Sequence, residues 1–343
     1  MNSTAATGRH EALKAGSTGL PSSAAGKPQR VYIGIDVGGT KIAAGLVSFP
    51  AGRVLAQRLK PTPARPQGRL ALDAVLSLAR ELAGEAGPLG QRLAGIGLGV
   101  CELVDRESHL ASSNCIQWLD LPVHEEFSTL APTVIEADVR AAALAEALLG
   151  AGKLFRTFLY VTVGTGISCC LMLDSEPHLG THGATGTMAS SPVSLPCEQC
   201  GHVSRRTLEE IAAGPALVAR FNSAHGHAAS GHDVLAGAAG GSEVAAGIVR
   251  TAAEALGSQV ALLVNVLDPG AVIVGGGLGL SAGPYWEHFL ASTRRHIWSN
   301  LHRELPVLRA ATGVDAGWMG AAARAWRMFP DGSDPAPGQS PHP

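Results

Sequence analysis

Hydrophobic positions in this chain follow two patterns: short continuous apolar runs, and longer segments in which apolar residues recur every three or four positions. The continuous runs predict strands at 31–36, 41–48, 53–59, 94–100 and 272–274, with a strand hairpin at 158–173. The periodic segments predict helices at 70–86, 137–150, 207–222, 242–266, 283–299 and 316–328. Because hairpins and strands separated by helices occur together, the pattern predicts an α/β protein with mixed sheets.

Two predicted hairpins enclose turns with almost no side chains. Residues 31–47 read V-Y-I-G-I-D-V-G-G-T-K-I-A-A-G-L-V, with the turn at 38–40. Residues 158–173 read F-L-Y-V-T-V-G-T-G-I-S-C-C-L-M-L, with the turn at 164–166. Such turns expose backbone N–H groups, so an anion can approach closely. The first pattern alone also fits an ordinary Gly-Gly hairpin, and the second turn of the same kind favours the anion site.

Two further features connect these turns to a nucleotide. Asp36 stands at the rim of the first turn, where a carboxylate suits Mg²⁺, which prefers oxygen ligands and keeps most of its water. A third glycine segment, V-I-V-G-G-G-L at 272–278, follows a buried type of strand. We therefore expect one nucleotide between two lobes, with its phosphates at the first two turns and its adenosine at the third.

The common nucleotide motifs are absent from the sequence. No G-x-x-x-x-G-K-[ST] occurs, which excludes a P-loop enzyme. No G-x-G-x-x-G follows a strand and opens a helix, which disfavours a Rossmann dinucleotide site. The nearest segment, G-I-G-L-G at 95–99, continues as V-C-E-L-V without a glycine that opens a helix.

Length and composition fit two domains of ordinary size. The 343 residues are 46% hydrophobic and 16% charged, as in a globular protein. Residues 1–29 and 330–343 lack apolar periodicity and predict disordered tails. Between them the strand–turn–strand pattern occurs twice, which predicts an N-terminal lobe at 30–150 and a C-terminal lobe at 151–315 around a cleft.

Charge and cysteine content narrow the expected partners and location. A net charge of −2 gives no basic field for nucleic acid. No apolar run reaches transmembrane length and no secretory segment is visible near the start, so we expect no membrane partner. Six cysteines in a chain this long do not form a disulfide framework, and a reducing cytoplasm is the expected location.

Asp138 is the catalytic candidate. It stands where an apolar strand ends in V-I-E-A and an alanine-rich helix begins. A carboxylate there can accept a hydroxyl proton while the hydroxyl oxygen attacks a γ-phosphate. The alternative is a helix N-cap, a position that Asp fills very often. The two phosphate-type turns favour the catalytic interpretation.

With these motifs in place, the chain resembles the ROK family of sugar kinases, within the actin/hexokinase/Hsp70-like ATPase superfamily. The likeness rests on five motifs in order: I-D-V-G-G-T-K at 35–41, E-A-D at 136–138, V-G-T-G-I at 163–167, V-I-V-G-G-G-L at 272–278 and D-A-G-W-M-G-A-A at 315–322. The resemblance implies two actin-like (ribonuclease H-like) lobes, with helix 316–328 completing the N-terminal one. It also implies ATP, Mg²⁺, phosphorylation of a sugar's primary hydroxyl, and a homodimer.

The resemblance assigns roles to individual residues. Asp138 takes the position of the catalytic base, and Asp36 holds Mg²⁺ through water. The nucleotide-binding positions are Asp36, Gly38, Gly39, Thr40, Lys41, Gly164, Thr165, Gly166, Gly275, Gly276 and Gly277. The substrate-binding positions are Asn114, Ala137, Asp138, Thr187, Ser190 and Glu209.

On the sugar side the chain departs from the family pattern. Ala137 stands where the family has a ring-binding asparagine, and Thr187 and Ser190 replace a Glu and a His that bind the anomeric end. Cys101-Glu102 replaces the Pro-Gly of the family's G-V-P-G segment. Arg140 stands where the family often has Asn, as a surface helix residue or one that reaches the substrate.

These departures disfavour plain glucose, because a site built for particular hydroxyls discriminates by its polar groups. A substrate altered around carbons one to three fits better, either a C7-cyclitol of the valiolone type or an amino sugar such as kanosamine. An ordinary glucokinase-like enzyme and a non-catalytic sugar- or nucleotide-binding protein remain as alternatives. A transcriptional repressor of the same family is set aside, since 1–29 are too short and aperiodic for a helix-turn-helix.

Zinc is an open alternative. The family motif C-x-C-G-x-x-G-C-x-E is altered here, leaving Cys197 and Cys200 as one C-x-x-C without the third cysteine. Of the nearby histidines, His202, His178 and His182 are possible replacements for the usual His ligand. The competing interpretation is a solvent-exposed loop with two free thiols.

Overall fold

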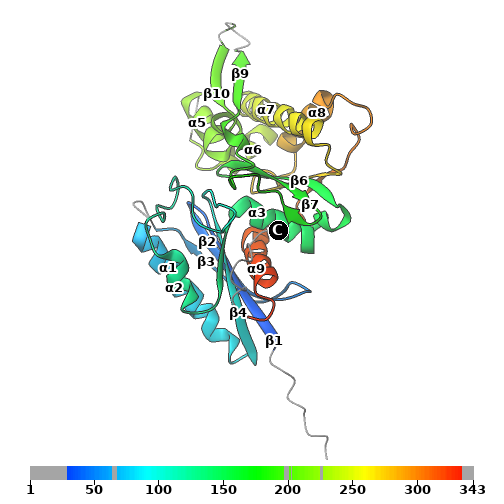
Figure 1. Cartoon of the computed structure of the whole chain (residues 1–343). Helices are drawn as coiled ribbons and strands as arrows, with labels where there is room; N and C mark the ends of the chain where they lie inside the picture. Colours follow the sequence, from blue (N-terminus) through cyan, green and yellow to red (C-terminus); the bar gives the residue numbers. More distant parts are fainter. Residues whose placement is uncertain (1–28, 64–67, 197–200, 202, 225–226, 334–343) are drawn as a thin grey trace, which may run out of the picture.

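Two five-stranded mixed sheets, one in each lobe, form the frame of the molecule (Figure 1). The computed structural model describes residues 29–63, 68–196, 201, 203–224 and 227–333. The strand orders are β3-β2-β1-β4-β5 in the N-terminal lobe and β12-β11-β6-β7-β8 in the C-terminal lobe. The predicted α/β class with two mixed sheets is therefore confirmed.

The N-terminal sheet consists of a three-stranded antiparallel part and two parallel additions. Its strands are β1 (Gln29–Val37), β2 (Lys41–Ser48), β3 (Arg53–Pro61), β4 (Gln91–Val100) and β5 (Thr133–Ala137). β2 pairs antiparallel with β1 and β3, whereas β4 lies parallel to β1 and to β5. The parallel pairs require crossovers, which α1 (Gly68–Ala86) and α2 (Val123–Ser128) supply.

The C-terminal sheet repeats this arrangement. Its strands are β6 (Thr157–Val163), β7 (Ile167–Leu173), β8 (Glu176–Pro177), β11 (Val272–Gly275) and β12 (Val307–Arg309). β6 pairs antiparallel with β7 and parallel with β11, as β1 does with β2 and β4. The first and second glycine turns therefore occupy equivalent ends of equivalent hairpins.

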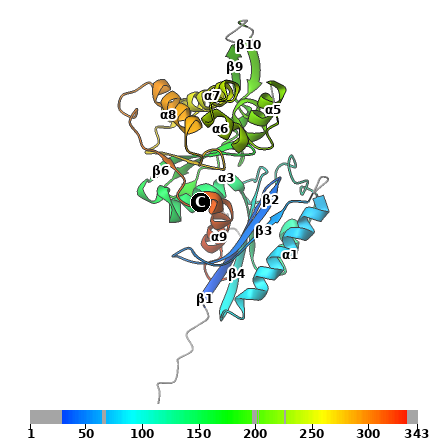
Figure 2. The same ribbon diagram turned by 180° about the vertical axis from the view of Figure 1, so that it is seen from behind.

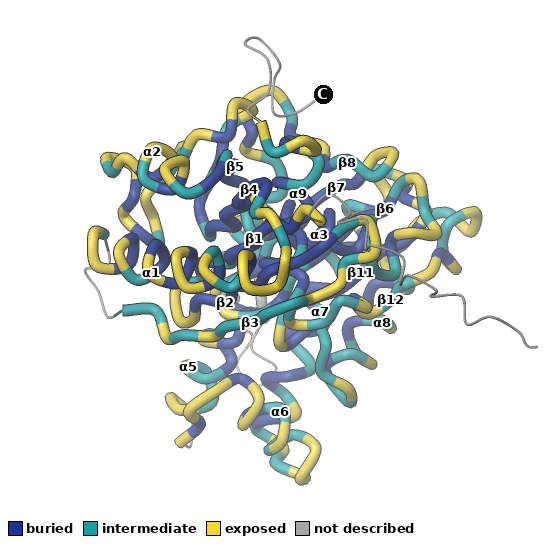
Figure 3. Tube along the Cα trace, turned by 90° about the horizontal axis from the view of Figure 1, so that it is seen from below, coloured by how far each residue is buried: buried dark blue, intermediate teal, exposed yellow. Residues whose placement is uncertain are grey.

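Alternating side chains place helices on both faces of each sheet. In β6, Leu159 and Val161 belong to the core under α7 (Glu243–Leu267) and α8 (Pro284–His296), while Phe158 and Tyr160 face α3 (Asp138–Leu149). Figure 3 shows the central strands β1, β4, β6 and β7 as mostly buried, whereas the edge strand β3 is largely intermediate or exposed. The remaining elements of the C-terminal lobe are η1 (Ala151–Leu154), η2 (Met188–Ser190), β9 (Pro192–Pro196), β10 (Val203–Thr207), α4 (Glu209–Ala212), α5 (Gly214–Ala224) and α6 (Gly231–Ala239).

Glycines bring α9 (Ala316–Met328), which follows η3 (Gly313–Asp315), into backbone contact with the N-terminal sheet and α3 (Figure 2). A Cβ added at Gly34 of β1 or Gly97 of β4 would overlap carbonyl oxygens of α9. A Cβ added at Gly320 would overlap the carbonyl oxygen of Ala141 in α3. The C-terminal helix thus lies against the first strand of the fold, nearly 300 residues away along the chain.

Some predicted elements differ from the structure. The single helix expected at 207–222 is divided into α4 and α5, because Ala213 adopts an extended conformation (ψ 160°) before Gly214-Pro215. The stretch at 174–205, where no strand or helix was predicted, contains β8, β9 and part of β10. The short helices α2 and α6 were not predicted, since neither has enough residues for a clear period.

Among the described residues, α7 is the one helix long and apolar enough by composition to cross a bilayer. Its apolar residues Val249, Leu256 and Val260 are fully buried in the C-terminal core. Arg250 and Glu254 interrupt its apolar sequence. Core burial accounts for the hydrophobicity of this helix.

Candidate functional site

The first glycine turn joins β1 to β2 and presents unbonded N–H groups. Two of its carbonyl oxygens are occupied, because Gly38 and Thr40 accept hydrogen bonds from the hydroxyl and N–H of Thr62 (2.7 and 3.0 Å). In the described part of the chain, the N–H groups of Gly39 and Thr40 have no partner. Gly39 also has open space where a side chain would lie. The turn is therefore able to receive an acceptor from outside.

The second turn joins β6 to β7 and is held from behind by Glu209. The Glu209 Oε2 atom accepts the Ile167 N–H at 2.9 Å, and Gly214 N–H donates to the Gly164 carbonyl at 2.8 Å. Gly164 N–H donates within the turn to Gly166 O at 3.0 Å. No residue that the structure describes accepts the Thr165 N–H, which the exposed turn presents to solvent.

The third glycine segment lies directly against the second turn. The Val163 carbonyl accepts N–H groups from Leu278 (3.0 Å) and Gly279 (3.1 Å). Gly276 has φ +79°, and a Cβ there would overlap the Val163 carbonyl oxygen. The structure thus brings together two of the three predicted turns, although more than 100 residues separate them in sequence.

Asp36 and Asp138 are close enough for the charge of Asp138 to perturb Asp36. The pKa of Asp36 is raised to about 7, chiefly by burial and then by the negative charge of Asp138, while Lys41 opposes the shift. Burial also raises the pKa of Asp138 to about 6, against the Val139 N–H (2.6 Å) and Arg140, while Glu102 adds to the rise. The predicted metal-binding acid and the predicted base therefore share one desolvated, negatively charged region.

This region suits a divalent cation held with water. Two adjacent carboxyl groups with raised pKa values fit a cation, because its charge favours their ionised forms. The described residues contain no group of three or more metal-ligating side chains. That donor set is poor for an all-protein cage and matches Mg²⁺, which binds through one or two carboxylates, phosphates and waters.

Two residues that sequence reasoning missed shape this region. Gly317, in the first turn of α9, leaves room for Asp36, because a Cβ there would lie 2.5 Å from Asp36 Oδ2. Tyr160 of β6 is buried near the two acids. Its pKa is raised by burial and then by the charges of Glu146, Asp138 and Asp36. A Cβ at Gly275 would overlap the Tyr160 hydroxyl, so this ring connects the acids to the third segment. No local pattern marks either residue.

Arg140 is buried and is not the surface helix residue that the sequence left open. Its Nε lies 2.5 Å from Glu136 Oε1, and Glu136 is also within 3.7 Å of the Arg324 Nε. Its two terminal nitrogens donate to the carbonyls of Val104 (2.8 Å) and Gly183 (3.2 Å). Arg140 therefore ties the start of α3 to one loop from each lobe.

The predicted substrate residues lie on both lobes. Thr187 and Ser190 are exposed beside β7, and the Ser190 hydroxyl donates to the Thr187 carbonyl at 3.0 Å. Ala137 ends β5 directly before Asp138. Asn114 is exposed on the loop after β4, and its N–H donates to Glu102 Oε2 at 2.8 Å. Glu209, whose Oε2 supports the second turn, is half-buried.

The predicted zinc ligands Cys197 and Cys200, with His202, lie outside the described residues. Of the other histidines considered, His178 and His182 are exposed on the β7–η2 connection. The structure therefore does not test the zinc alternative, which stays a prediction from the sequence.

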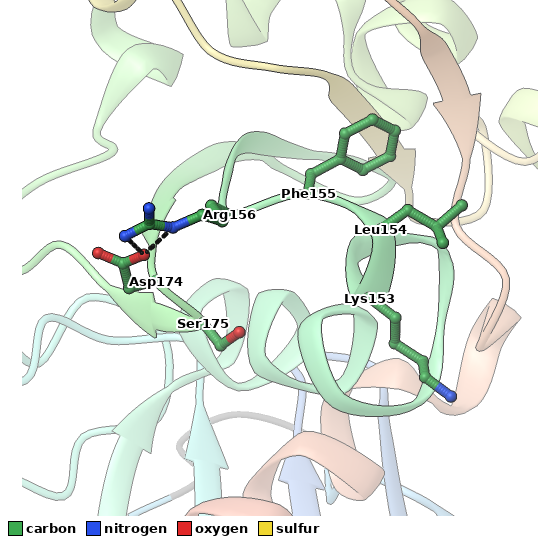
Figure 4. Close-up of a pocket in the computed structure, with 6 residues that line it drawn as sticks. All are labelled: Lys153, Leu154, Phe155, Arg156, Asp174 and Ser175. Carbon is green, nitrogen blue, oxygen red and sulfur yellow. Dashed lines mark hydrogen bonds and ion pairs between the residues drawn. The ribbon is translucent and has the colours of Figure 1, made fainter.

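A surface hollow of about 220 Å³ lies away from these residues (Figure 4). It is lined by Lys153, Leu154, Phe155, Arg156, Asp174 and Ser175. These residues flank the start of β6 and the end of β7, at the opposite end of the hairpin from the second turn. Arg156 and Asp174 pair with each other at 2.6 Å, which leaves Lys153 as the charged lining residue outside this pair.

Comparison with known proteins agrees with this arrangement. The sequence profile of the ROK family matches residues 32–327. A glucokinase from Streptomyces coelicolor is 31% identical over 315 residues, covering 84% of this chain and 96% of that protein. A ROK hexokinase structure from Thermus thermophilus gives a TM-score of 0.71 at 33% identity, covering 88% and 100% of the two chains. A ROK family glucokinase from Streptomyces griseus, solved with glucose and AMPPNP, gives 0.72 at 27% identity over 87% and 99%. This chain belongs to the ROK family, and the two-lobed, actin-like fold expected from that resemblance is confirmed.

Proposed function

We propose that this protein is an ATP-dependent kinase that phosphorylates the primary hydroxyl of a hexose-like small molecule. The proposal rests chiefly on one juxtaposition. The second turn lies against the third glycine segment, the first and second turns carry free N–H groups, and the charge of Asp138 helps to raise the pKa of Asp36. The similarity to glucokinases and a hexokinase supports the same reaction class.

Phosphoryl transfer in this site needs a base, a positioned γ-phosphate and charge stabilisation. Asp138 would accept the proton of the acceptor hydroxyl as the hydroxyl oxygen forms its bond to the γ-phosphorus. The bond from that phosphorus to the bridging oxygen breaks, and ADP leaves with the electron pair. Mg²⁺, held through water by Asp36, supplies positive charge for the phosphates when bound.

Chain groups around the nucleotide would bind its phosphates and exclude water. The free N–H groups of Gly39, Thr40 and Thr165 are suited to phosphate oxygens, and Lys41, exposed beside the first turn, adds a positive charge. We assign the adenosine to the third segment, at Gly275, Gly276 and Gly277. Gly277 is exposed there, and only the ring of His232 lies near its missing side chain.

For the acceptor we propose a compound altered around carbons one to three, a valiolone-type C7-cyclitol or an amino sugar such as kanosamine. Ala137, Thr187 and Ser190 lack the charged and amide groups that the family uses for these positions. Hexoses, amino sugars and cyclitols assayed with ATP and Mg²⁺ would decide between them. A clear preference for glucose would reject this substrate and leave an ordinary glucokinase.

The altered sugar motifs also favour a second candidate, a ROK-fold protein that binds sugar or nucleotide without turnover. Asp138→Ala separates the two. We expect the variant to lose ATP consumption by a factor of about 100 or more relative to wild type, since a positioned base contributes this much. Equal, near-zero ATP consumption in both proteins would support the non-catalytic alternative.

We also propose a cytoplasmic homodimer, with no nucleic-acid or membrane partner, as the family resemblance and the composition suggest. Light scattering of the purified protein measures its mass directly. Metal analysis of the same sample decides the zinc alternative at Cys197 and Cys200.

A further inference from the structure

Glu102 is a buried carboxylate with an unusual set of partners. It lies two residues beyond β4 and is 6% exposed. Its Oε2 accepts the Ser112 hydroxyl (2.5 Å) and the Asn114 N–H (2.8 Å). Its Oε1 accepts the N–H groups of Cys115 and Ile116, the latter at 2.9 Å. Four donors from one short loop thus converge on a single side chain.

The loop that donates these bonds carries a predicted substrate residue. Three consecutive backbone N–H groups, from residues 114–116, form a concave surface that binds the carboxylate as it would an anion. The Asn114 side chain is exposed and makes no hydrogen bond with the described residues. Because Glu102 holds the backbone N–H of Asn114, it fixes the point from which this free amide extends.

The same loop lies beside the catalytic candidate. The thiols of Cys101 and Cys115 are hydrogen-bonded to each other. The charge of Glu102 reaches Asp138 and raises its pKa as a smaller contribution after burial. Geometry agrees, since Val100 of β4 pairs with Ala137 of β5, so Glu102 and Asp138 follow the same end of two adjacent strands. The hydrogen bonds from residues 112–116 to Glu102, called the clamp below, therefore lie near Asp138. The glycine turns proposed for the nucleotide make no hydrogen bond to it.

We propose that Glu102 is a positioning residue that holds loop 112–116 in place and thereby presents Asn114 to the acceptor. The inference rests on the proposed kinase function, whose acceptor site it specifies. Glu102 replaces the glycine of the family's G-V-P-G segment, so the clamp is a feature of this chain. Acceptor binding should therefore depend on Glu102, although Glu102 itself does not contact the acceptor.

Glu102→Gln tests the clamp in the full-length protein. The amide would turn an N–H₂ group toward backbone N–H donors, leaving at least one of them unsatisfied. We expect the KM for the best acceptor of the panel, with glucose assayed in parallel, to rise about tenfold, while the KM for ATP stays unchanged. Glu102→Asp keeps the charge and should recover part of the loss.

Hydrogen exchange gives a readout that does not need activity. The amides of 114–116 should exchange faster in Glu102→Gln than in wild type, because their carboxylate acceptor is gone. If that variant fails to fold, Ser112→Ala removes a single donor and should shift the same two measurements in the same direction by less.

Glu146→Gln is the matched control. Glu146 is also a buried carboxylate with four donors: the N–H groups of Ala151, Ala311 and Thr312, and the Thr312 hydroxyl. It lies eight residues beyond Asp138 in α3, about 12 Å along the helix axis. Its loss should lower stability without raising the acceptor KM relative to the ATP KM.

Three outcomes would overturn the proposal. The first is unchanged exchange at 114–116 in Glu102→Gln, and the second is an equal rise in both KM values. The third is an acceptor-selective loss in Glu146→Gln. A wild-type protein that phosphorylates no acceptor would instead reject the proposed function and the acceptor claim with it, and the exchange result alone would then decide whether Glu102 holds the loop.

Discussion

At the scale of single residues, Asp36 and Asp138 stabilise the fold less at neutral pH than in acid. Both pKa values, about 7 and about 6, lie above the ordinary Asp value of 3.8. A raised pKa in the folded state means that folding favours the protonated form. Its stabilisation is complete below pH 3.8 and is lost as the pH rises through 6 to 7. The site is thus strained in the ionised state that base catalysis requires.

Asp138→Asn should therefore raise stability while removing activity. At pH 8 we expect the free energy of unfolding to increase by roughly 1–3 kcal/mol, since the neutral amide avoids burial of a charge. The gain should shrink as the pH falls from 8 towards 4. Urea unfolding across this range measures it, and Asp120→Asn, at an exposed position, is the control. A variant less stable than wild type at pH 8 would contradict the assignment of strain to Asp138.

Some residues of the candidate site can be predicted from the sequence and others cannot. Asp36 and Asp138 were found because each lies next to the end of an apolar strand, in a motif that can be recognised locally. Glu102, Tyr160 and Gly317 were not assigned roles, because their partners lie ten to almost 300 positions away and only the fold brings them together. The predicted roles of Thr187 and Ser190 remain predictions.

At the scale of elements, α3 is held in place by a buried ion pair. Arg140 and Glu136 are 2% and 1% exposed, and Arg140 also donates to loops of both lobes. A buried pair contributes little net stability compared with apolar residues, but removing one partner leaves an uncompensated charge. The start of α3, and with it Asp138, is thus positioned by Arg140.

Arg140→Met should destabilise the protein by about 3–5 kcal/mol. Glu136 loses its shorter ion pair and keeps Arg324 at 3.7 Å, and the carbonyls of Val104 and Gly183 lose a donor. Denaturant unfolding measures the change. Arg69→Met, which breaks exposed pairs with Asp73 and Glu126, should cost less than about 1 kcal/mol. Adding Glu136→Gln to Arg140→Met should recover part of the loss. Equal effects of the two arginine substitutions would show that Arg140 does not position α3.

Elements whose boundaries depend on local periodicity were predicted from the sequence, whereas those that depend on a single residue or on strand pairing were not. The strands of both hairpins and the long helices α1, α7 and α9 were predicted within a few residues. When one face of an element is buried, apolar residues recur in the sequence with the period of that element. β9 and β10 were missed: β10, S-R-R-T after Val203, is polar and largely exposed and carries no alternation. The break between α4 and α5 depends on one extended residue.

At the scale of the whole molecule, the nucleotide site depends on segments of the C-terminal lobe that meet only after folding. The Val163 carbonyl, directly before the second turn, accepts N–H groups from Leu278 and Gly279 at the end of the third segment. Gly276 permits this contact through its positive φ and missing side chain. The Tyr160 hydroxyl lies against Gly275 of the third segment. Besides burial, the charges of Asp36 in the N-terminal lobe and of Asp138 and Glu146 in α3 raise its pKa. One substitution at Gly276 should therefore affect nucleotide binding far more than overall folding.

A ligand that binds only the native state at 100 times its Kd stabilises a protein by about 2.7 kcal/mol. We expect AMPPNP with Mg²⁺ to raise the melting temperature of wild type accordingly. In Gly276→Ala the rise should disappear, because the new methyl group displaces the second turn from the third segment. Gly241→Ala is the matched control, with a similar φ (+93°) and no atom within 4 Å of the added Cβ. It carries the same backbone strain and should keep the full rise. If Gly276→Ala kept it too, the nucleotide would have to bind elsewhere, since contact between these two segments is what the proposed adenosine and phosphate positions require.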